Sequence, residues 1–392
     1  MRFVGIDIAS EKHVVAVVDE VAGVLVKPTG FGEDAGGYGK LFELLGAATE
    51  VLVAMEATGH YWKNLFAELA ARGFPVALLN PVRTRRFAGE DLERTKTDAI
   101  DALGIARFAQ QKRPSVTRLT DAATDELREL VRHRERLVQD FGDRTRQLHR
   151  LVDLGFPELK RFIHTLDSQL ATAVLHEYPT AEAFLGLPWK KLAKFRYDGV
   201  HIVGEELAKS IVETAKVSVG RHHGYAYRLQ VQHACEDLDL LRRRIKQLDR
   251  DIGTKLGEHE VGSLLTTIDG IGPTTAARLL AELGDPADFR DASAIAAYVG
   301  VVPALKQSGK RTSSRAGLTP IGNARLRAAL WMPTLTAVRK NLWLKGHYQR
   351  LRARGKLPKV ALVACMRKLL VAVHAVAKHR RPFVPEVAGG TA

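Results

Sequence analysis

Two acidic residues stand three positions apart in the stretch LERTKTDAIDAL, residues 92–103, of a chain with a large excess of basic residues. Thr97 is a suitable N-cap for a helix that begins at Asp98, and at this spacing Asp98 and Asp101 share one helical face. Carboxylates in the first turn of a helix interact favourably with its dipole, which is the simplest explanation of the pair. Alone, the pair therefore indicates only a helix start.

Two further acidic residues change this interpretation. Asp7 lies in a first apolar run, residues 3–8, and Glu56 directly follows a second one, residues 51–55. A carboxylate on a buried strand is costly unless it is paired or binds a metal, and α/β sheets place ligands at the carboxyl ends of strands. Carboxylates from two strands and one helix face can form a Mg²⁺ or Mn²⁺ site that positions a reacting phosphate. We therefore predict catalytic metal ligands at Asp7, Glu56, Asp98 and Asp101.

A glycine turn, Gly270-Ile271-Gly272, separates two helical segments in the stretch DGIGPTTAARLLAELGD, residues 269–285. Such a turn exposes backbone N–H groups, and a helix that starts near Pro273 presents its N-terminus to an anion such as a DNA phosphate. An ordinary helical hairpin with a glycine turn explains the pattern equally well. As nucleic-acid-binding residues we predict Gly270, Gly272 and Thr274.

Ser308 lies in a basic segment, VVPALKQSGKRTSSRAGLTPIGNARLRAAL, residues 301–330. A hydroxyl beside a glycine and among permanent cations is able to attack a phosphate while arginine stabilises the developing charge. Because the spacing fixes no base beside the serine, a basic loop that contacts nucleic acid without chemistry fits the pattern better, and Ser313 and Ser314 compete as nucleophiles. In this segment we predict nucleic-acid contacts at Lys310, Arg311, Arg315, Asn323 and Arg325.

Apolar and β-branched runs at residues 3–8, 13–18, 51–55 and 75–79, with a shorter one at 23–27, predict the strands that position the first two acids. Helical spacing at 38–45 and 61–72 places helices between the later strands, so we expect a mixed sheet covered by helices. Long amphipathic helices at 121–154 and 231–256 can pair as an antiparallel coiled coil. Residues 160–230 show mixed helix and loop signals, and from 263 the pattern is helical up to a last amphipathic helix at 359–378.

The 392 residues carry a net charge of +15 and are 46% hydrophobic and 26% charged. An excess of Lys and Arg in folded segments favours a polyanionic partner, because neutralised phosphates release counterions. Cys235 and Cys365 are the only cysteines, which excludes a zinc ribbon or a disulfide scaffold and fits a reducing cytosol. The late apolar run 360–373 is broken by Arg367 and Lys368, so we expect a cytoplasmic protein without a membrane span.

Five segments together resemble the DEDD transposases of bacterial insertion sequences, the IS110 family. They are FVGIDIASEKHVVAV, VAMEATGHYW, LNPVRTRRFAG…RTKTDAIDALGIARF, IDGIGPTTAARLLAELGD and YVGVVPALKQSGKRTSSRAGLTPIGNARLRAALW, in the order of the family. The resemblance implies an α/β, RuvC-like (RNase H fold) domain at 1–120 that carries the four acids. It further implies a coiled-coil and linker region at 121–258, a mostly helical transposase domain with a helix-hairpin-helix-like motif at 259–345, and a C-terminal helix and tail at 346–392.

The resemblance also implies a mechanism. Ser308 would be the nucleophile and would form a transient phosphoserine link to DNA, while the acids and Mg²⁺ (or Mn²⁺) orient the phosphate. Family members assemble as homodimers and tetramers, in which acids and serine of different protomers meet, and a structured bridge RNA pairs with donor and target DNA. We therefore expect a nucleoid-associated, site-specific DNA recombinase of the cytoplasm.

Three other interpretations remain open. A RuvC-type, metal-dependent Holliday-junction nuclease needs only the acids and forms no covalent serine intermediate. A sugar-kinase-like ATPase is suggested by GIDIAS, but no second phosphate loop of the DxGxT type follows it. A helix-hairpin DNA-binding module would leave the acids on the buried strands without a role.

Overall fold

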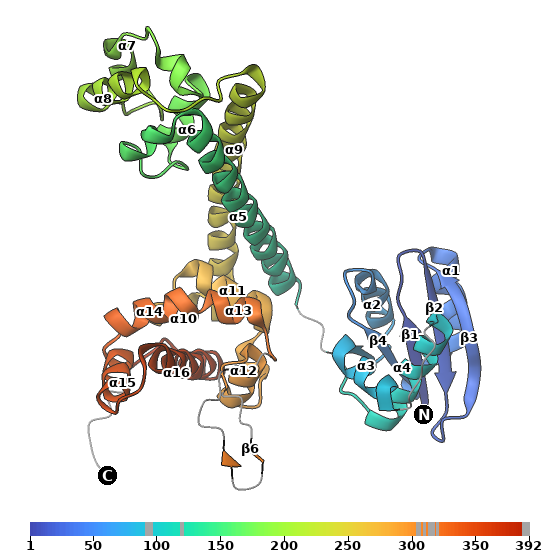
Figure 1. Cartoon of the computed structure of the whole chain (residues 1–392). Coiled ribbons are helices and arrows are strands. Elements are labelled where there is room, and N and C mark those ends of the chain that lie inside the picture. The colour runs from blue at the N-terminus through green and yellow to red at the C-terminus, as the bar shows by residue number, and fades with distance from the viewer. Residues whose placement is uncertain are drawn as a thin grey trace. The chain divides into compact units, whose positions relative to one another are not determined.

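The computed structural model describes residues 1–90, 97–117, 121–302, 307–308, 311–312, 318 and 321–385. The chain forms two compact units, residues 1–120 and 121–392. The first unit is built from a sheet and helices, and the described part of the second is helical apart from one short hairpin (Figure 1).

A five-stranded mixed sheet forms the centre of the first unit, in the order β3-β2-β1-β4-β5 (Figure 1). β1 (Arg2–Asp7) pairs antiparallel with β2 (Lys12–Val18), which pairs antiparallel with β3 (Val24–Gly32). β1 also pairs parallel with β4 (Val51–Glu56), and β4 pairs parallel with β5 (Val76–Leu79). The predicted strands and the mixed sheet are confirmed.

β3 is longer than the apolar run at 23–27 predicts. Pro28, Gly30 and Gly32 interrupt the apolar pattern but still belong to the strand. They are tolerated because β3 is an edge strand, where a proline without an N–H group and glycines without side chains cost the sheet little.

Helices cover both faces of this sheet. α1 (Ala35–Leu45) and α2 (Trp62–Ala71) pack their leucines against one face, beside Val4 and Ile6. α3 (Pro81–Glu90) and α4 (Asp98–Lys112) pack on the opposite face, in the cluster that contains Phe3. Because β1 and β4 are buried on both faces, their sequences are continuous apolar runs.

Two long helices, α5 (Ala122–Gly155) and α9 (Tyr225–Glu258), run along each other in the second unit (Figure 1). Salt bridges of 2.5 Å between Arg134 and Asp249 and 3.0 Å between Arg144 and Asp237 join them. Since the partner's number falls as the number in α5 rises, the two helices are antiparallel. The predicted antiparallel pairing is confirmed, and α9 starts at Tyr225 rather than near residue 231.

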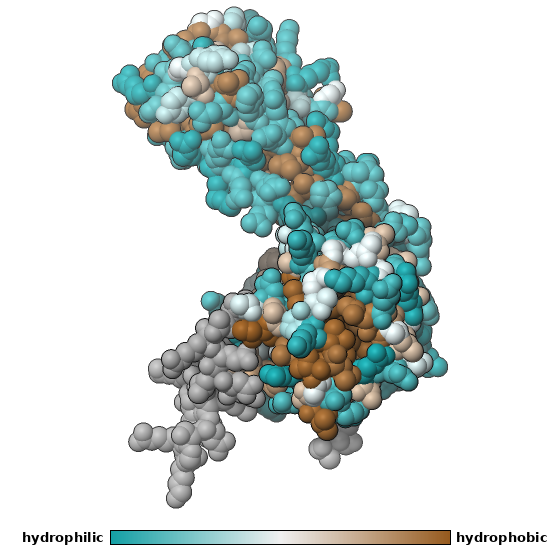
Figure 2. All heavy atoms as spheres, turned by 90° about the vertical axis from the view of Figure 1, so that its right-hand side faces the viewer, coloured by the Kyte–Doolittle hydropathy of each residue, from teal (hydrophilic) through white to brown (hydrophobic). Residues whose placement is uncertain are grey.

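A small helical lobe, residues 156–224, lies between these two helices in the sequence and shares a core with one end of the pair. It contains α6 (Gln169–Glu177), α7 (Trp189–Ala193), α8 (Glu205–Lys216) and 3-10 turns at Pro157–Arg161 and Ala181–Phe184. The lobe, at the top of Figure 2, shows mostly hydrophilic side chains on the visible face. Tertiary packing, not pattern, stabilises helices of 5 to 12 residues, so the sequence did not resolve their order.

The C-terminal helices pack around α16 (Pro358–His379). By length and composition α16 could cross a membrane, but 61% of its apolar stretch is buried inside the protein, as in the core helix of a globular domain. Two short strands, β6 (Gln307–Ser308) and β7 (Arg311–Thr312), pair antiparallel. The other elements are α10 (Glu260–Leu265), α11 (Pro273–Leu283), a 3-10 turn (Pro286–Asp288), α12 (Ala292–Val299), α13 (Ala324–Ala329), α14 (Trp331–Lys340) and α15 (Leu342–Ala353).

Candidate functional site

Asp7 and Glu56 end two neighbouring parallel strands. The register of β1 and β4 pairs Gly5 with Ala54 and Ile6 with Met55, so the next position along each strand is Asp7 and Glu56. Both residues are half-buried, whereas the four residues before Asp7 and the five before Glu56 are buried. The two carboxylates therefore lie side by side at the carboxyl edge of the sheet, where the chain leaves the core.

α4 lies directly on β1 at Gly5. A Cβ atom at Gly5 would stand 2.2 Å from both the carbonyl oxygen of Ala102 and the amide nitrogen of Ala106, so only glycine permits this approach. Further back along β1, the guanidinium of Arg113 lies 5.6 Å from the centre of the Phe3 ring. The helix and the strand therefore run in opposite directions, and the first turn of α4 points to the end of β1 that carries Asp7.

This first turn carries the other two acids. Thr97 caps it as predicted, since its hydroxyl accepts a hydrogen bond of 3.3 Å from the N–H of Ile100. Along β1, Asp7 lies about 7 Å beyond Gly5, and along α4 residues 98–101 lie about 2–6 Å beyond Ala102. The fold thus brings the four predicted acids to one edge of the sheet, called here the acidic edge: Asp7, Glu56, Asp98 and Asp101.

Two threonines that the sequence did not single out hold Glu56. Thr84, in the first turns of α3, donates a short hydrogen bond to Glu56 Oε1 and another of 3.1 Å to the carbonyl of Pro81. Thr58 donates one of 3.4 Å to Glu56 Oε2. Thr84 is buried, so its hydroxyl fixes one carboxylate oxygen. A threonine in a helix after Asn80-Pro81 gives no such signal in the sequence.

His13 anchors the loop that follows Asp7. Its ring is fully buried, and Nδ1 accepts a hydrogen bond of 3.2 Å from the N–H of Ala9. Nε2 therefore carries the proton and donates to Glu33 over 2.6 Å. The chain leaving the acidic edge is thus tied to β2 and to the segment before α1.

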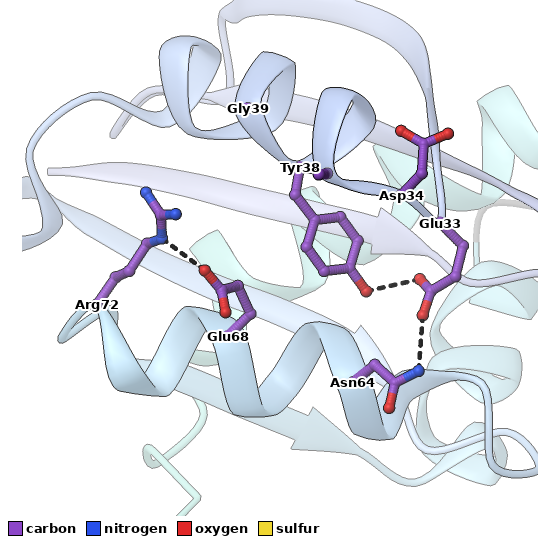
Figure 3. Close-up of a pocket in the computed structure, with 8 residues that line it drawn as sticks. Glu33, Asp34, Tyr38, Gly39, Asn64, Glu68 and Arg72 are labelled. Carbon is purple, nitrogen blue, oxygen red and sulfur yellow. Dashed lines mark hydrogen bonds and ion pairs between the residues drawn. The ribbon is translucent and has the colours of Figure 1, made fainter.

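Glu33 borders a hollow of about 420 Å³ between α1 and α2 (Figure 3). It accepts hydrogen bonds of 2.7 Å from the Tyr38 hydroxyl and 3.1 Å from the Asn64 amide, while Arg72 and Glu68 pair over 2.8 Å. Burial alone would raise the pKa of Glu33, but hydrogen bonds from Tyr38, His13 and Asn64 outweigh it and lower this pKa. Since these polar groups bind one another, we assign them a structural role and do not interpret the hollow as a binding site.

The acidic edge fits a hard divalent cation by the chemistry of its donors. All four side chains are carboxylates, which suit Mg²⁺ or Mn²⁺, and no histidine or thiol competes among them. Over the described ranges, no group of three or more His, Cys, Asp or Glu side chains is placed so that it could hold a metal ion. The edge thus offers carboxylates of the right chemistry, and the geometry of a metal site is part of the proposal below.

The predicted glycine turn lies between α10 and α11 in the second unit. Gly270 has φ +102° and packs so closely on α14 that a Cβ would stand 2.6 Å from the Cβ of Ala337. Gly272 is the N-cap of α11, and a Cβ there would meet nothing within 4 Å. Thr274, in the first turn of α11, is half-buried. Gly270 therefore has a structural reason to be glycine, whereas Gly272 leaves open space before the helix.

Ser308 lies in the β6–β7 hairpin, where its backbone is paired with that of Arg311. Lys310, Ser313, Ser314 and Arg315 lie outside the described residues. The sequence analysis predicted no strands here, because two-residue strands carry no periodic pattern. The backbone register places the predicted nucleophile opposite a predicted phosphate ligand.

Asn323 and Arg325 lie at a joint between α5, α11 and α13. The Asn323 side chain accepts a hydrogen bond of 3.0 Å from the N–H of Leu326 and donates one of 2.7 Å to Glu282. Arg325 pairs with Glu282 over 3.5 Å and with Glu135 over 3.6 Å, and 55% of its side chain is exposed. Both predicted nucleic-acid ligands thus have partners within the protein.

Comparison with known proteins finds two matching family models in sequence order. A model of DEDD transposases of the IS110 type, described as "Transposase", matches residues 4–157, and a model described as "Transposase IS116/IS110/IS902 family" matches residues 262–349. The first match contains the acidic edge, and the second contains the glycine turn and Ser308.

Curated relatives match over most of their length. An uncharacterized 44.8 kDa protein of insertion element IS116 from Streptomyces clavuligerus is 28% identical, with 98% of this chain and 96% of the relative covered. An uncharacterized 43.6 kDa protein of insertion element IS110 from Streptomyces coelicolor is 27% identical, with 78% and 76% covered. A pilin gene-inverting protein from Moraxella bovis is 25% identical, with 84% and 80% covered.

Proposed function

This chain belongs to the IS110 family of DEDD transposases and is a DNA transposase or recombinase, and we propose that it cuts and rejoins DNA strands with groups from both of its units. The observation that carries this proposal is the acidic edge of the first unit. Two strand ends and one helix turn bring Asp7, Glu56 and the pair Asp98 and Asp101 to one edge of the sheet, although these three segments are far apart in the sequence. An RuvC-like fold of this unit is part of the proposal.

The acidic edge would hold Mg²⁺ or Mn²⁺ through its four carboxylates. The ion would stabilise negative charge on the oxygens of the scissile phosphate. Glu56 is oriented for this role by the hydroxyls of Thr84 and Thr58. His13 holds the backbone after Asp7, and the Thr97 cap fixes the turn that carries Asp98 and Asp101.

Ser308 is the proposed nucleophile. Its Oγ would form a bond to phosphorus as one bridging P–O bond breaks, with the hydroxyl proton passing to solvent and the departing strand oxygen taking up a proton. A hydroxyl of the second DNA strand would then attack the phosphoserine, form the new P–O bond and release the serine. The neighbouring cations Lys310, Arg311 and Arg315 would stabilise the charge on the phosphate.

The proposed DNA contacts of the second unit begin at the glycine turn. Gly272 leaves the N-terminus of α11 open, which suits a phosphate oxygen. With Gly270, Thr274, Asn323 and Arg325 it would form one nucleic-acid surface. A structured guide RNA that pairs with donor and target DNA, and dimers or tetramers that unite acids and serine from different protomers, complete the proposal. The protein would act in the cytoplasm, on the nucleoid.

Removal of single groups tests this mechanism. Asp101→Ala and Ser308→Ala are each expected to abolish recombination of a donor and a target plasmid while RNA binding is unchanged. EDTA is expected to stop the wild-type reaction, and Mg²⁺ or Mn²⁺ to restore it. Matched controls are Glu43→Gln and Ser263→Ala, two exposed positions outside the proposed site. Recombination by Ser308→Ala would contradict the assignment of the nucleophile.

A RuvC-type junction nuclease is the second candidate, because the acidic edge is formed by the first unit alone. The two candidates differ in the covalent intermediate. Denaturation of wild-type reactions with labelled DNA is expected to trap a protein–DNA adduct that Ser308→Ala lacks. Metal-dependent cleavage without any adduct would favour the nuclease.

A further inference from the structure

The positive charge of the chain is concentrated near its C-terminus. Residues 259–392 hold 21 of the 59 Lys and Arg residues but only 7 of the 44 Asp and Glu residues, so they account for +14 of the net charge of +15. Between Asp291 and Glu386 the sequence contains no acidic residue. Many of these positions lie beyond residue 349, where the matched family model ends.

Five of these cations surround the turn from α15 to α16. They form what is called here the basic turn: Arg350, Arg352, Arg354, Lys356 and Lys359. All five are exposed, and they occupy a span of ten residues, 350–359. The backbone beneath them is well defined, because α15 ends at Ala353, α16 begins at Pro358, and Arg352 donates a hydrogen bond to the carbonyl of Lys356. The turn therefore fixes the backbone positions from which these cations project.

The basic turn lacks counter-ions among the residues that the structure describes. Within the part of the chain that the structure describes, none of its five side chains forms a salt bridge. Elsewhere in the same unit, cations are commonly paired, as in the 3.0 Å contact between Lys255 and Glu126. Single exposed cations without a salt bridge also occur elsewhere in the described part of this unit. The basic turn differs because it gathers five of them within ten residues, in a segment without any acidic residue, and this density indicates an external anion.

Neighbouring groups show the effect of this crowding. The ammonium of Lys368, on α16, lies 4.4 Å from the centre of the Trp343 ring. Its pKa is lowered by burial and by the charge of Arg350, and the pKa of His347 is lowered by burial and by Lys368 and Arg350. The repulsion between these groups would be relieved by a bound polyanion.

We propose that the basic turn binds the phosphate backbone of duplex DNA. Guanidinium and ammonium groups suit phosphates, and phosphate contacts position a protein on DNA without reading its sequence. The large aromatic residues of α15, Trp343 and Tyr348, are half-buried and pack against the core, so they offer no platform for unpaired bases. This surface therefore suits a double helix, whose phosphates it can bind, better than a single strand, whose bases it has no aromatic platform to stack.

The number of phosphates that the basic turn neutralises can be measured from the salt dependence of DNA binding. Each neutralised phosphate contributes about −0.9 to the slope of log affinity against log salt. Five contacts correspond to a slope of about −4.5, or about a 500-fold loss of affinity between roughly 50 and 200 mM salt. If all five side chains are neutralised, this part of the salt dependence disappears.

The test compares two full-length variants of equal charge. One carries Arg350→Gln, Arg352→Gln, Arg354→Gln, Lys356→Gln and Lys359→Gln. The control carries five Gln substitutions at exposed cations that also lack salt bridges among the described residues: Arg136, Arg150, Lys194, Arg243 and Lys246. Affinity is measured at several salt concentrations for a short DNA duplex without element sequence, a structured RNA hairpin and vesicles containing phosphatidylglycerol. Circular dichroism and thermal unfolding verify that both variants are folded.

The expected result is a loss of duplex affinity and of salt slope in the basic-turn variant, with a much smaller loss in the control. Equal losses in the two variants would overturn the proposal, because bulk charge would then explain binding. A loss on RNA that equals or exceeds the loss on DNA would assign the turn to RNA. A loss on vesicles alone would assign it, with the exposed Leu357 and Val360, to a membrane surface. None of these readouts depends on Ser308, so the proposed strand exchange can fail while this proposal stands.

Discussion

A side chain at position 5 would occupy space that the backbone of α4 already fills, since its Cβ would stand 2.2 Å from two backbone atoms. Gly5→Ala is expected to push α4 away from β1 and to lower the free energy of unfolding by about 1–3 kcal/mol. Because α4 carries Asp98 and Asp101, DNA cleavage should fall more than stability alone explains. Urea unfolding and a plasmid cleavage assay measure the two effects.

Gly104 provides the matched control for this substitution. It lies inside α4, and a Cβ there would meet nothing within 4 Å. Gly104→Ala is expected to stabilise the first unit by about 0.5–1 kcal/mol, since alanine favours a helix over glycine, and to leave cleavage unchanged. Equal behaviour of the two variants would show that α4 does not depend on close contact with β1.

Glu33 makes the first unit sensitive to acid. Its pKa is lowered in the folded protein, so the unfolded chain binds more protons below the ordinary value of 4.5. The stabilisation is therefore fully present above that pH and is lost as the pH falls below it. Glu33→Gln is expected to cost about 1–2 kcal/mol at neutral pH, because three hydrogen bonds reach this carboxylate.

The difference between Glu33→Gln and wild type should shrink as the pH falls from 5 to 3. The urea midpoint of each protein is measured at each pH. Subtracting the midpoint of the variant from that of wild type cancels the contribution of the other carboxylates, which titrate in both proteins. A difference in urea midpoint that stays constant from pH 5 to pH 3 would show that the ionised form of Glu33 does not stabilise the folded protein more than the protonated form does.

At the scale of single elements, the joint of α5, α11 and α13 depends on Glu282. This side chain is only 10% exposed and pairs with Arg132 over 3.4 Å and with Arg325 over 3.5 Å. Glu282→Ala is expected to destabilise the second unit by about 2–3 kcal/mol, because it leaves charged and polar partners without their acceptor. Urea unfolding measures this loss.

Asn323→Ala probes the same joint from the other side. It removes the N-cap of the six-residue helix α13 and the hydrogen bond to Glu282, so a loss of about 1 kcal/mol is expected. If stability is unchanged and DNA affinity falls instead, the Asn323 amide contacts DNA, as predicted from the sequence. The joint of α5, α11 and α13 then does not depend on this side chain.

Local rules predicted the elements with strong patterns. Continuous apolar runs identified β1 and β4, and the Thr97 cap identified the start of α4. The placement of acids at strand ends followed from a general rule for sheets, which is why two residues 49 positions apart, Asp7 and Glu56, could be grouped before the fold was seen. These inferences need only the chain's own periodicity.

Contacts between elements could not be predicted in this way. The hydroxyl of Thr84 reaches Glu56 only because α3 folds back over the strand end, and no spacing encodes that path. The role of His13 could not be predicted either, because its partners Ala9 and Glu33 come from a loop and from the segment before α1. The short helices of the lobe carried too little pattern to be ordered at all.

At the scale of the whole molecule, acids and excess charge are separated along the chain. Residues 1–120 contain 15 Lys and Arg and 15 Asp and Glu, so the unit with the acidic edge has no net charge of its own. The positive excess belongs to residues 259–392. Affinity for DNA and chemistry on DNA are therefore expected to respond to different substitutions, which is what the salt and cleavage assays separate.

The antiparallel pair of α5 and α9 has a consequence for motion. Its two ends belong to different cores, one shared with the lobe and one shared with the C-terminal helices. With 34 residues in each helix, the pair is about 50 Å long, and a tilt of about 10° at one end moves the other by about 9 Å. If the proposed DNA contacts tilt the pair on the C-terminal helices, fluorophores on the lobe and on α16 would report that tilt as a displacement large enough to measure.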